Sequence, residues 1–530
     1  MNYTDEQRDI LKETGHCVII ATPGSGKTAT ITAMVQAKLE TLRSHKGVIA
    51  ISYTNKASLE LRQRIRHGGA DSKSSFFGTI DKFFISEVII PFGRHVWGVP
   101  KKEIKIMKFG DLTAAYAKAG EPQRYEFNSL CRDAEELGKL YQHGVVVLEA
   151  VGFLACYIFN QSNACRRYLN ARYTDIVVDE YQDCGEWQHQ FFLLLVGLGV
   201  RGIAVGDLDQ AIFAWAEKYP RFLRELAEDN RFNAYRLTVN HRCHPAIAHY
   251  AAKFLSREHE VPPGQEIRVF HAHVNGSERD IGEWLNSAVP EIGARFKIDT
   301  RNKLAILVRY NRTADLIKET LTIPYRHALS TELDEDNTPA CVAFKDILHW
   351  LFNPKETRRE FLEEFVDPYT PKTTQRRLVH LLSDLQLAVP FEADETGKIV
   401  EMLVRIAEIT TAKPVTRRAA RRLSNVLESG QWVNFTPPFS EEVQLMTIHK
   451  SKGLEFDVVV HLDIYEHVLP KFKKEAEPEE ANLHYVALTR AKTACILCTS
   501  SSRHNDYKEL PASASPFMNR EGLAALRQRW

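Results

Sequence analysis

The chain has little that would place it in a membrane. Its longest apolar run, Phe191–Val200, is about half of the roughly 20 residues that a spanning helix needs. The first residues, Met1 to Gln7, lack a basic start followed by an apolar stretch, so no secretory signal peptide is predicted. We therefore expect a cytoplasmic protein without a membrane partner.

Cysteine is sparse and unpatterned, which argues against a disulfide framework. The nine cysteines are an odd number in a chain of 530 residues, as is typical of reduced thiols. One Cys-x-x-Cys pair, Cys495 and Cys498, lies within an apolar run that is predicted to be a strand. We interpret the pair as buried core thiols. The alternative, a zinc or iron–sulfur site, would need two further ligands at suitable spacing, and none stands out.

The sequence also lacks an excess of charge of either sign. Its 69 basic and 68 acidic side chains give a net charge of +1, so no global basic surface indicates a nucleic-acid partner. Any DNA binding must therefore come from local arrangements of basic and aromatic side chains. The 44% hydrophobic and 26% charged shares exclude a disordered or collagen-like chain.

What the chain does contain is a series of short apolar runs separated by amphipathic stretches. Its length predicts about three or four modules. The runs are rich in Val and Ile, which is typical of buried strands in a parallel sheet, and the helical patterns between them predict βαβ units. The runs are Cys17–Ala21, Gly47–Ile51, Asp175–Val178, Arg201–Val205, Lys303–Val308, Val458–Leu462 and Thr493–Cys498.

Two long stretches, 91–170 and 331–439, break this alternation. Both are predicted to be mostly helical, without a clear buried strand. We interpret them as insertions into two strand–helix cores, and Pro437-Pro438 marks the return to the second core. The predicted α/β fold has a first core of residues 1–90 and 171–242 with insertion 91–170, and a second core of residues 243–330 and 440–530 with a reduced insertion, 331–439.

The strongest local signal is a glycine-rich turn directly after the first apolar run. Glycines let backbone N–H groups wrap phosphates, and the N-terminus of the helix predicted to begin near Lys27 adds partial positive charge. Lys27 is predicted to reach the β and γ phosphates of ATP, and the Thr28 hydroxyl to hold Mg²⁺. Ala21 stands where the strict pattern has glycine. The predicted nucleotide-binding segment is Ala21, Thr22, Pro23, Gly24, Ser25, Gly26, Lys27, Thr28 and Ala29.

A second signal is a hydrophobic run that ends in two carboxylates, Asp179 and Glu180. On its own such a run is common and mostly structural. Beside a phosphate-binding loop, however, Asp179 is predicted to hold Mg²⁺, directly or through water. Glu180 is predicted to orient and deprotonate the attacking water. Together the two signals predict a site that hydrolyses ATP with Mg²⁺.

Tyr181-Gln182-Asp183 completes an Asp-Glu-Tyr-Gln-Asp segment, and here the chain resembles the UvrD/Rep/PcrA family of superfamily 1A DNA helicases. Motifs occur in the family's order from Gln7 to about Thr499. The resemblance implies two RecA-like P-loop cores, 1A and 2A, each built on a parallel sheet and carrying a helical insertion, 1B or 2B. It also implies an ATPase that moves 3′ to 5′ on single-stranded DNA and separates the duplex ahead.

For the nucleotide, the resemblance implies roles for residues outside the phosphate loop. Gln7 matches the glutamine that reads the adenine edge, and Glu455 matches the residue that binds ribose. His241 replaces a tyrosine that stacks on adenine, and an imidazole stacks more weakly.

Three further residues are implied to act on the γ-phosphate. Gln210 would sense it and Arg242 would contact it, while Arg490 would be an arginine finger supplied by the second core. Fixed cations of this kind stabilise the charge that develops in the transition state.

For DNA, the resemblance implies contacts from Tyr53, Thr54 and Asn55. Thr79 keeps its match, but Ile80 and Asp81 stand where the family usually has an aromatic residue and a histidine. Since an aspartate would repel a phosphate, we expect Asp81 to point elsewhere.

Further DNA contacts are implied along the chain. Phe213 and Trp215 would stack on bases, at roughly 1–3 kcal/mol per base, with two core aromatics as the alternative. Thr447, His449 and Lys452 would face DNA or the coupling path.

The chain is compact for the family, because its second insertion is short. That insertion carries Arg417, Arg418, Arg421 and Arg422 on one helix face, which is either a phosphate-binding face or a solvated or partner surface. Small members of this build resemble the helicase subunits of bacterial antiphage systems such as Gabija. A separate nuclease subunit is therefore a candidate partner, and DNA repair is the alternative setting.

The sequence leaves three functions open. The first is a motor that translocates on DNA and unwinds it. The second is a DNA-triggered ATPase that serves as a sensor or regulatory subunit with little unwinding, favoured by the short insertion and the altered Thr79-Ile80-Asp81 segment. The third is a binding module that has lost turnover. It is opposed by the intact set of Lys27, Glu180, Gln210, Arg242 and Arg490.

Overall fold

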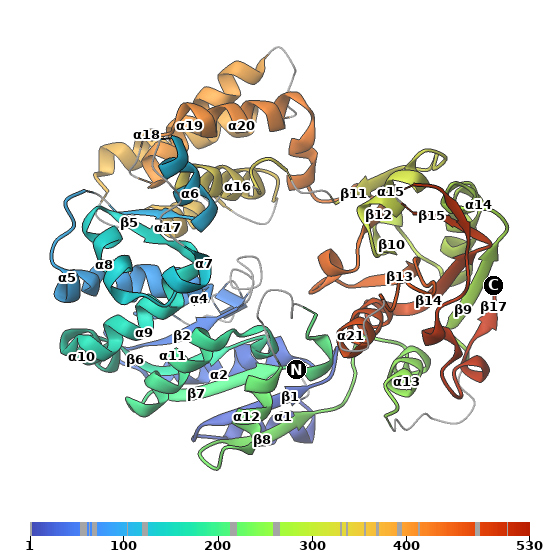
Figure 1. Cartoon of the computed structure of the whole chain (residues 1–530), viewed down its shortest axis with the longest axis horizontal. Helices are drawn as coiled ribbons and strands as arrows, with labels where there is room; N and C mark the ends of the chain where they lie inside the picture. Colours follow the sequence, from blue (N-terminus) through green and yellow to red (C-terminus); the bar gives the residue numbers. More distant parts are fainter. Residues whose placement is uncertain are drawn as a thin grey trace. The chain divides into compact units, whose positions relative to one another are not determined.

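The chain divides into two compact units (Figure 1). The larger unit comprises Met1–Ile298, Leu304–Thr322 and Thr447–Trp530, and the smaller one Asp299–Lys303 and Ile323–Met446. The computed structural model describes residues 3–52, 61–62, 64–65, 71–102, 104–118, 126–212, 220–257, 266–328, 331–334, 336, 338–353, 357–366, 370–389, 395–411, 414–471, 477–505 and 507–530. In this part of the chain, no helix combines the length and apolarity of a membrane-spanning segment.

The first core of the larger unit is a six-stranded parallel sheet in the order β3-β2-β6-β7-β1-β8. Its central strands are buried along almost their whole length, as expected for a sheet covered on both faces. The four apolar runs predicted in this region are confirmed as strands, two of them with both ends as predicted. The strands are β1 (Cys17–Ala21), β2 (Gly47–Ile51), β3 (Phe76–Gly78), β6 (Tyr173–Val178), β7 (Arg201–Gly206) and β8 (Asn233–Leu237).

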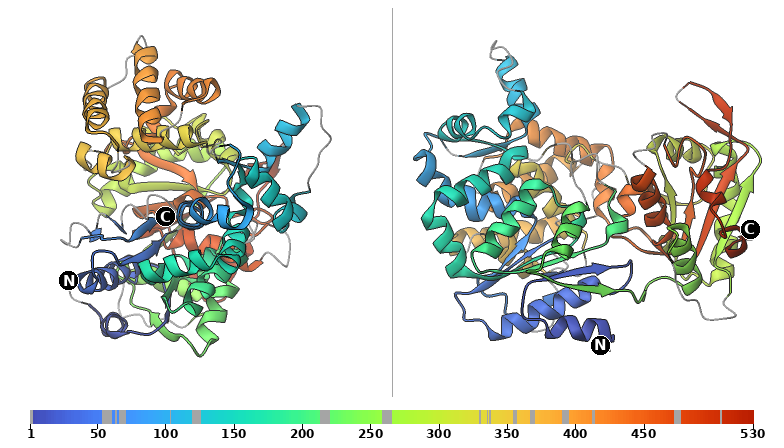
Figure 2. Two further views of the ribbon diagram at one scale, coloured as in Figure 1. Left: turned by 90° about the vertical axis from the view of Figure 1, so that its left-hand side faces the viewer. Right: turned by 60° about the horizontal axis from the view of Figure 1, so that its bottom comes forward.

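Helices cover both faces of this sheet (Figures 1 and 2). Cys17 and Ile19 pack with residues of the blue helices α1 and α2, whereas Val18 packs in a second cluster with residues of α9, α11 and α12. This alternation follows from the two-residue period of a strand. The helices are α1 (Asp5–Lys12), α2 (Lys27–Thr41), α4 (Ile80–Phe83), α9 (Val151–Gln161), α10 (Asn163–Arg172), α11 (Glu186–Gly197) and α12 (Arg221–Glu228).

The stretch 91–170 is mostly helical, but the expectation that it holds no buried strand was wrong. Two short strands, β4 (Lys105–Met107) and β5 (Val145–Val147), pair in parallel, and Val146 and Val147 are buried. Three-residue strands are too short for alternation to reveal them. The helices here are α5 (Ile90–Trp97), α6 (Phe109–Lys118), α7 (Phe127–Leu130) and α8 (Ala134–Gln142).

The second core of the larger unit contains parallel strands in the order β10-β13-β14-β9-β17. Cys495 and Cys498 lie buried in β14, as predicted, and burial raises the pKa of both thiols. The strands are β9 (Val269–Val274), β10 (Leu304–Val308), β13 (Phe456–His461), β14 (Ala491–Ser500) and β17 (Gln528–Arg529), with a hairpin of β15 (Ser502–His504) and β16 (Glu509–Pro511). The helices are α13 (Pro245–Phe254), α14 (Glu278–Phe296), α15 (Asn311–Lys318) and α21 (Glu477–Leu488).

The smaller unit is mainly helical around one apolar cluster. In α20, Arg417, Arg418 and Arg421 are exposed, but Arg422 donates to the Glu332 carbonyl at 2.6 Å, so it is not part of a free cationic face. The elements are β11 (Tyr325–His327), β12 (Val443–Thr447), α16 (Pro339–Leu351), α17 (Arg358–Phe365), α18 (Lys372–Leu387), α19 (Thr396–Thr411) and α20 (Arg417–Glu428).

Candidate nucleotide-binding and hydrolysis site

The phosphate loop lies between β1 and α2, as predicted, and its shape depends on two glycines. Gly24 and Gly26 have φ angles of 72° and 83°, a region that other residues enter only with strain. A Cβ atom on Gly24 would lie 2.5 Å from Cβ of Arg242, and one on Gly26 would lie 2.6 Å from Nε2 of Gln7. The glycines therefore allow both the turn and the close approach of residues predicted to bind nucleotide.

The loop is held by its own backbone and by neighbouring strands. The Thr22 N–H donates to the Leu237 carbonyl at 2.9 Å, and the Ser25 hydroxyl donates to the Thr22 carbonyl at 2.8 Å. The exposed His241 donates its N–H to the Gly24 carbonyl at 2.9 Å, which brings it beside the loop. Its stacking on adenine stays a prediction.

Gln7 joins the first helix to the phosphate loop. Its Oε1 accepts from the Thr4 N–H at 3.1 Å, in the capping box of α1, and its Nε2 donates to the Ser25 carbonyl at 3.3 Å. The residue is buried. Its place beside the loop agrees with the predicted location, and its reading of adenine remains a prediction.

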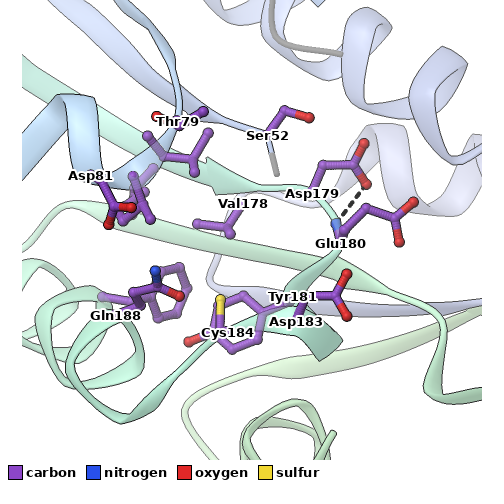
Figure 3. Close-up of a pocket in the computed structure, with 14 residues that line it drawn as sticks. Ser52, Thr79, Asp81, Val178, Asp179, Glu180, Tyr181, Asp183, Cys184 and Gln188 are labelled. Atoms are coloured by element: carbon purple, nitrogen blue, oxygen red, sulfur yellow. Dashed lines mark hydrogen bonds between the residues drawn. The ribbon is translucent and has the colours of Figure 1, made fainter. Parts of the chain in front are cut away.

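Asp179 and Glu180 follow the end of β6, beside the loop. The Asp179 N–H donates to the Ile51 carbonyl, and the Glu180 N–H donates to Oδ1 of Asp179 (Figure 3), both at 2.9 Å. Glu180 has a φ of 54°, which is strained for a residue with a side chain and common at functional sites. The strain fixes where its carboxylate leaves the backbone.

Charged side chains lie close to these two carboxylates. Nζ of Lys27 lies 3.6 Å from Oε2 of Glu180. Burial lowers the pKa of Lys27, but Glu180 and Asp207 outweigh burial and raise this pKa. Burial raises the pKa of Glu180, but Lys27 and Lys452 bring it well below its usual range, so the carboxylate is ionised. An ionised Glu180 is what a general base requires.

Asp179 differs from its neighbour. Burial and the Glu180 charge raise the pKa of Asp179, which marks a place where added positive charge would stabilise the ionised carboxylate. With Thr28 at the start of α2, the donors near the loop are hard oxygens of the kind that Mg²⁺ prefers. These residues therefore fit a magnesium ion held together with nucleotide phosphates.

The second core contributes Arg490, which is almost fully buried. Its guanidinium donates to Oε1 of Gln210 and to the Leu454 carbonyl, each at 3.2 Å. Burial and Arg242 lower the pKa of Arg490 to about 10, so it remains cationic at neutral pH. The structure thus brings together Arg490 and Gln210, two residues that were predicted to act on the same phosphate.

Glu455 forms ion pairs with two cationic side chains. Its carboxylate lies 2.9 Å from Nε of Arg242 and 2.6 Å from Nζ of Lys492. Sequence reasoning missed Lys492, although its position two residues after Arg490 was an available signal. The predicted contact of Glu455 with ribose remains a prediction.

Lys452 bridges two segments of the first core. Its Nζ donates to Oδ2 of Asp183 at 2.6 Å and to the Gln210 carbonyl at 2.7 Å. His449 lies 3.5 Å from Arg309, and burial and Arg309 lower its pKa to about 4, so the imidazole is neutral. The roles of both residues in coupling or in DNA contact stay predictions.

A cavity of about 280 Å³ adjoins the hydrolysis site (Figure 3). Thr79, the N-cap of α4, and Asp81 line it from one side, and Asp179 and Glu180 line it from the other. Asp183 adds a further carboxylate. Asp81 therefore lies at the side of the cavity away from Asp179 and Glu180, and the expectation that it points away from a phosphate stays a prediction.

Most of the remaining predicted DNA contacts lie outside the described residues. They are Tyr53, Thr54 and Asn55 before α4, and Phe213 and Trp215 after β7. Thr447 is the last residue of β12. Sequence reasoning also missed Gln182 and Asp207, whose roles depend on contacts between segments distant in the chain.

Comparisons with known proteins cover nearly the whole chain. Residues 324–502 match a model of the UvrD-like helicase C-terminal domain, and residues 7–216 match a model of an AAA domain. The chain is 23% identical to Gabija protein GajB of Bacillus cereus, over 95% of this chain and 97% of that protein.

Two helicases are similar over comparable lengths. DNA helicase II of Haemophilus influenzae is 23% identical over 99% of this chain and 88% of its own length. ATP-dependent DNA helicase Rep of Salmonella typhimurium is 23% identical, with 94% and 90% coverage. With its two parallel-sheet cores and its phosphate loop, the chain belongs to the UvrD-like family of ATP-dependent DNA helicases.

Proposed function

We propose that this protein couples the hydrolysis of Mg-ATP to movement along single-stranded DNA, in the 3′ to 5′ direction, and separates the duplex ahead. The observation that carries the proposal is the contact of Arg490 with Gln210. It joins a buried cation of the second core to the segment after β7 in the first core. A site built from two cores can link hydrolysis to their relative motion.

Within this proposal, each residue has a definite task. Backbone N–H groups of the loop and Nζ of Lys27 bind the phosphates, while Thr28 and Asp179 hold Mg²⁺. The ion, when bound, neutralises charge on the phosphate oxygens. Glu180 takes a proton from the attacking water.

The cations of the site act on the charge that develops in the transition state. Arg242 and Arg490 approach from β8's end and from the second core, and they stabilise negative charge on the γ-phosphate. Because Lys452 also reaches Asp183 and Gln210, opening of the two cores would remove two cations together.

The first experiment is steady-state ATP hydrolysis with and without single-stranded DNA, with Glu180→Gln as the blank. We expect turnover that DNA stimulates at least about tenfold, and strand separation of a duplex with a 3′ tail but not with a 5′ tail. Turnover that ignores DNA would overturn the motor proposal, and unwinding from a 5′ tail would overturn its direction.

A second candidate is a DNA-triggered ATPase that serves as the regulatory subunit of a nuclease complex. The altered Thr79-Ile80-Asp81 segment favours it, since the carboxylate of Asp81 would weaken a phosphate contact expected of a motor. Strong DNA-stimulated turnover without strand separation would support this candidate.

The similarity to Gabija protein GajB over most of both chains suggests bacterial antiphage defence, with a separate nuclease as partner. The alternative setting is DNA repair. Phage plating on cells that carry the wild type or Glu180→Gln, each together with a candidate nuclease partner, would distinguish the two. Equal plating on both strains would oppose the defence role.

A further inference from the structure

Gln182 lies fully buried between two segments that end neighbouring strands of the first sheet. Its Nε2 donates to Oε2 of Glu180, and its Oε1 accepts from the Asp207 N–H at 2.9 Å. The amide therefore uses its donor on the carboxylate side and its acceptor on the backbone side. Reversing it would set like dipoles against each other, so its orientation is fixed.

The first sheet leaves room for this amide at one glycine. A Cβ atom on Gly206 would lie 2.5 Å from Oε1 of Gln182 and 2.8 Å from a methyl group of Leu223. Gly206 has an ordinary extended backbone at the end of β7, so the conformation itself does not demand glycine. Glycine is needed at this position because Gln182 approaches it closely.

The contact also selects which oxygen of Glu180 is used. Gln182 Nε2 and Lys27 Nζ both approach Oε2, the latter at 3.6 Å. Neither of these two contacts is to Oε1, so we expect Oε1 to accept the proton from water. A restraint at Oε2 has a clear purpose, because Glu180 leaves the backbone from a strained turn.

Beyond Asp207, further hydrogen bonds lead to the second core. Oδ2 of Asp207 accepts from Nε2 of Gln210 at 2.7 Å, and Oε1 of Gln210 accepts from Arg490 at 3.2 Å. A connected series therefore runs through Glu180, Gln182, Asp207, Gln210 and Arg490.

We propose that Gln182 is a positioning residue for ATP hydrolysis, which orients Glu180 and ties its orientation to the segment Asp207–Gln210. The inference rests on the proposed function, in which Glu180 is the general base. Gln182 does not itself contact the phosphate loop in the described hydrogen bonds. Its loss should thus lower kcat and leave ATP binding intact.

The test compares three variants with the wild type by steady-state kinetics and by equilibrium binding of a fluorescent ATP analogue. Gln182→Met keeps the length and removes both hydrogen bonds. Gln182→Glu keeps an acceptor for the Asp207 N–H but removes the donor to Glu180. The matched control is Gln190→Met, because Gln190 is an exposed glutamine in α11.

We expect Gln182→Met to lower kcat about 10- to 100-fold, with KM for ATP and analogue affinity within about threefold of wild type. Gln182→Glu should lower kcat further, because its carboxylate repels Glu180. Gly206→Ala should show the same split by displacing Gln182. The control should match the wild type, and thermal melts identify any variant that fails to fold.

The outcomes distinguish a failure of the proposed function from a failure of the role of Gln182. A wild type with no more turnover than Glu180→Gln would remove the proposed function. An active wild type together with wild-type kcat in both Gln182→Met and Gly206→Ala would overturn the role of Gln182. Equal losses of kcat and analogue affinity would also overturn it, since they indicate a general structural defect.

Discussion

The two cores of the larger unit contribute opposite chemistry to the site. The first core supplies a backbone loop and the carboxylates Asp179, Glu180 and Asp207, with Lys27 as the cation beside them. The second core supplies cations, Arg490 and Lys452, that reach the first core's polar groups. Under the proposed function, we therefore expect the first core to hold the phosphates and fast hydrolysis to need the cations of the second.

Arg490→Ala should give the largest fall in kcat, because it removes a cation that the second core supplies. We expect kcat to fall about 1,000-fold while ATP binding is retained, because an arginine finger stabilises only the transition state. Arg490→Lys should not restore activity, since one ammonium cannot replace a planar group that bonds Val486, Leu454 and Gln210. Single-turnover hydrolysis and analogue binding measure both quantities. Loss of binding equal to loss of kcat would contradict the comparison.

Glu180→Gln tests the first core's catalytic share. We expect kcat to fall about 100-fold or more, with ATP bound but not hydrolysed, because the amide accepts no proton. Lys27→Ala is the contrasting variant and should lose ATP binding as well. Filter binding of labelled ATP distinguishes them, and weak binding by Glu180→Gln would contradict a purely catalytic role.

Lys452→Met tests the contact that the second core makes with Asp183 of the first core. It leaves the Asp183 carboxylate buried without its cation, so we expect DNA-stimulated kcat to fall about tenfold and the melting temperature to drop by several degrees. The control is Lys12→Met, because the Lys12 side chain is exposed on α1. Restored melting in Lys452→Met combined with Asp183→Leu would support the pairing, and additive losses would oppose it.

Glu13→Gln should give the smallest effect, confined to the first core. The Tyr235 hydroxyl, the Gly15 N–H and the Asn233 amide bring the pKa of Glu13 to about 2. Because the folded pKa is depressed, the stabilisation is present above the unfolded pKa of about 4.5 and is lost as pH falls towards 2. At pH 7 the variant should be less stable by about 1 kcal/mol, after allowance for solvent screening. Calorimetry at pH 7 and pH 3 measures the difference, which should shrink at the lower pH.

Local patterns predicted the first core well. The strand before the loop, the glycines at 24 and 26 and the paired carboxylates are each adjacent in the chain, so a short window contains the whole signal. The second core's contributions were predicted only through family resemblance. Arg490 meets Gln210 across 280 positions, and no local period encodes such a meeting.

Other parts of the site could not be predicted for a related reason. The tie between Gln182 and the Asp207 N–H depends on which strands are neighbours, and β6 and β7 are joined in the sheet rather than by any shared motif. Likewise, Arg422 was placed on a cationic face by helical spacing alone. Its bond to the Glu332 carbonyl depends on how the smaller unit packs.

The single ammonium of Lys452 has a kinetic consequence. It donates to the Asp183 carboxylate and to the Gln210 carbonyl at once. If one bond breaks, the lysine gains freedom and the other bond should weaken, so we expect half-released arrangements to be short-lived. Departure of the lysine would then occur in one abrupt event, which would give a motor discrete steps rather than a gradual slide.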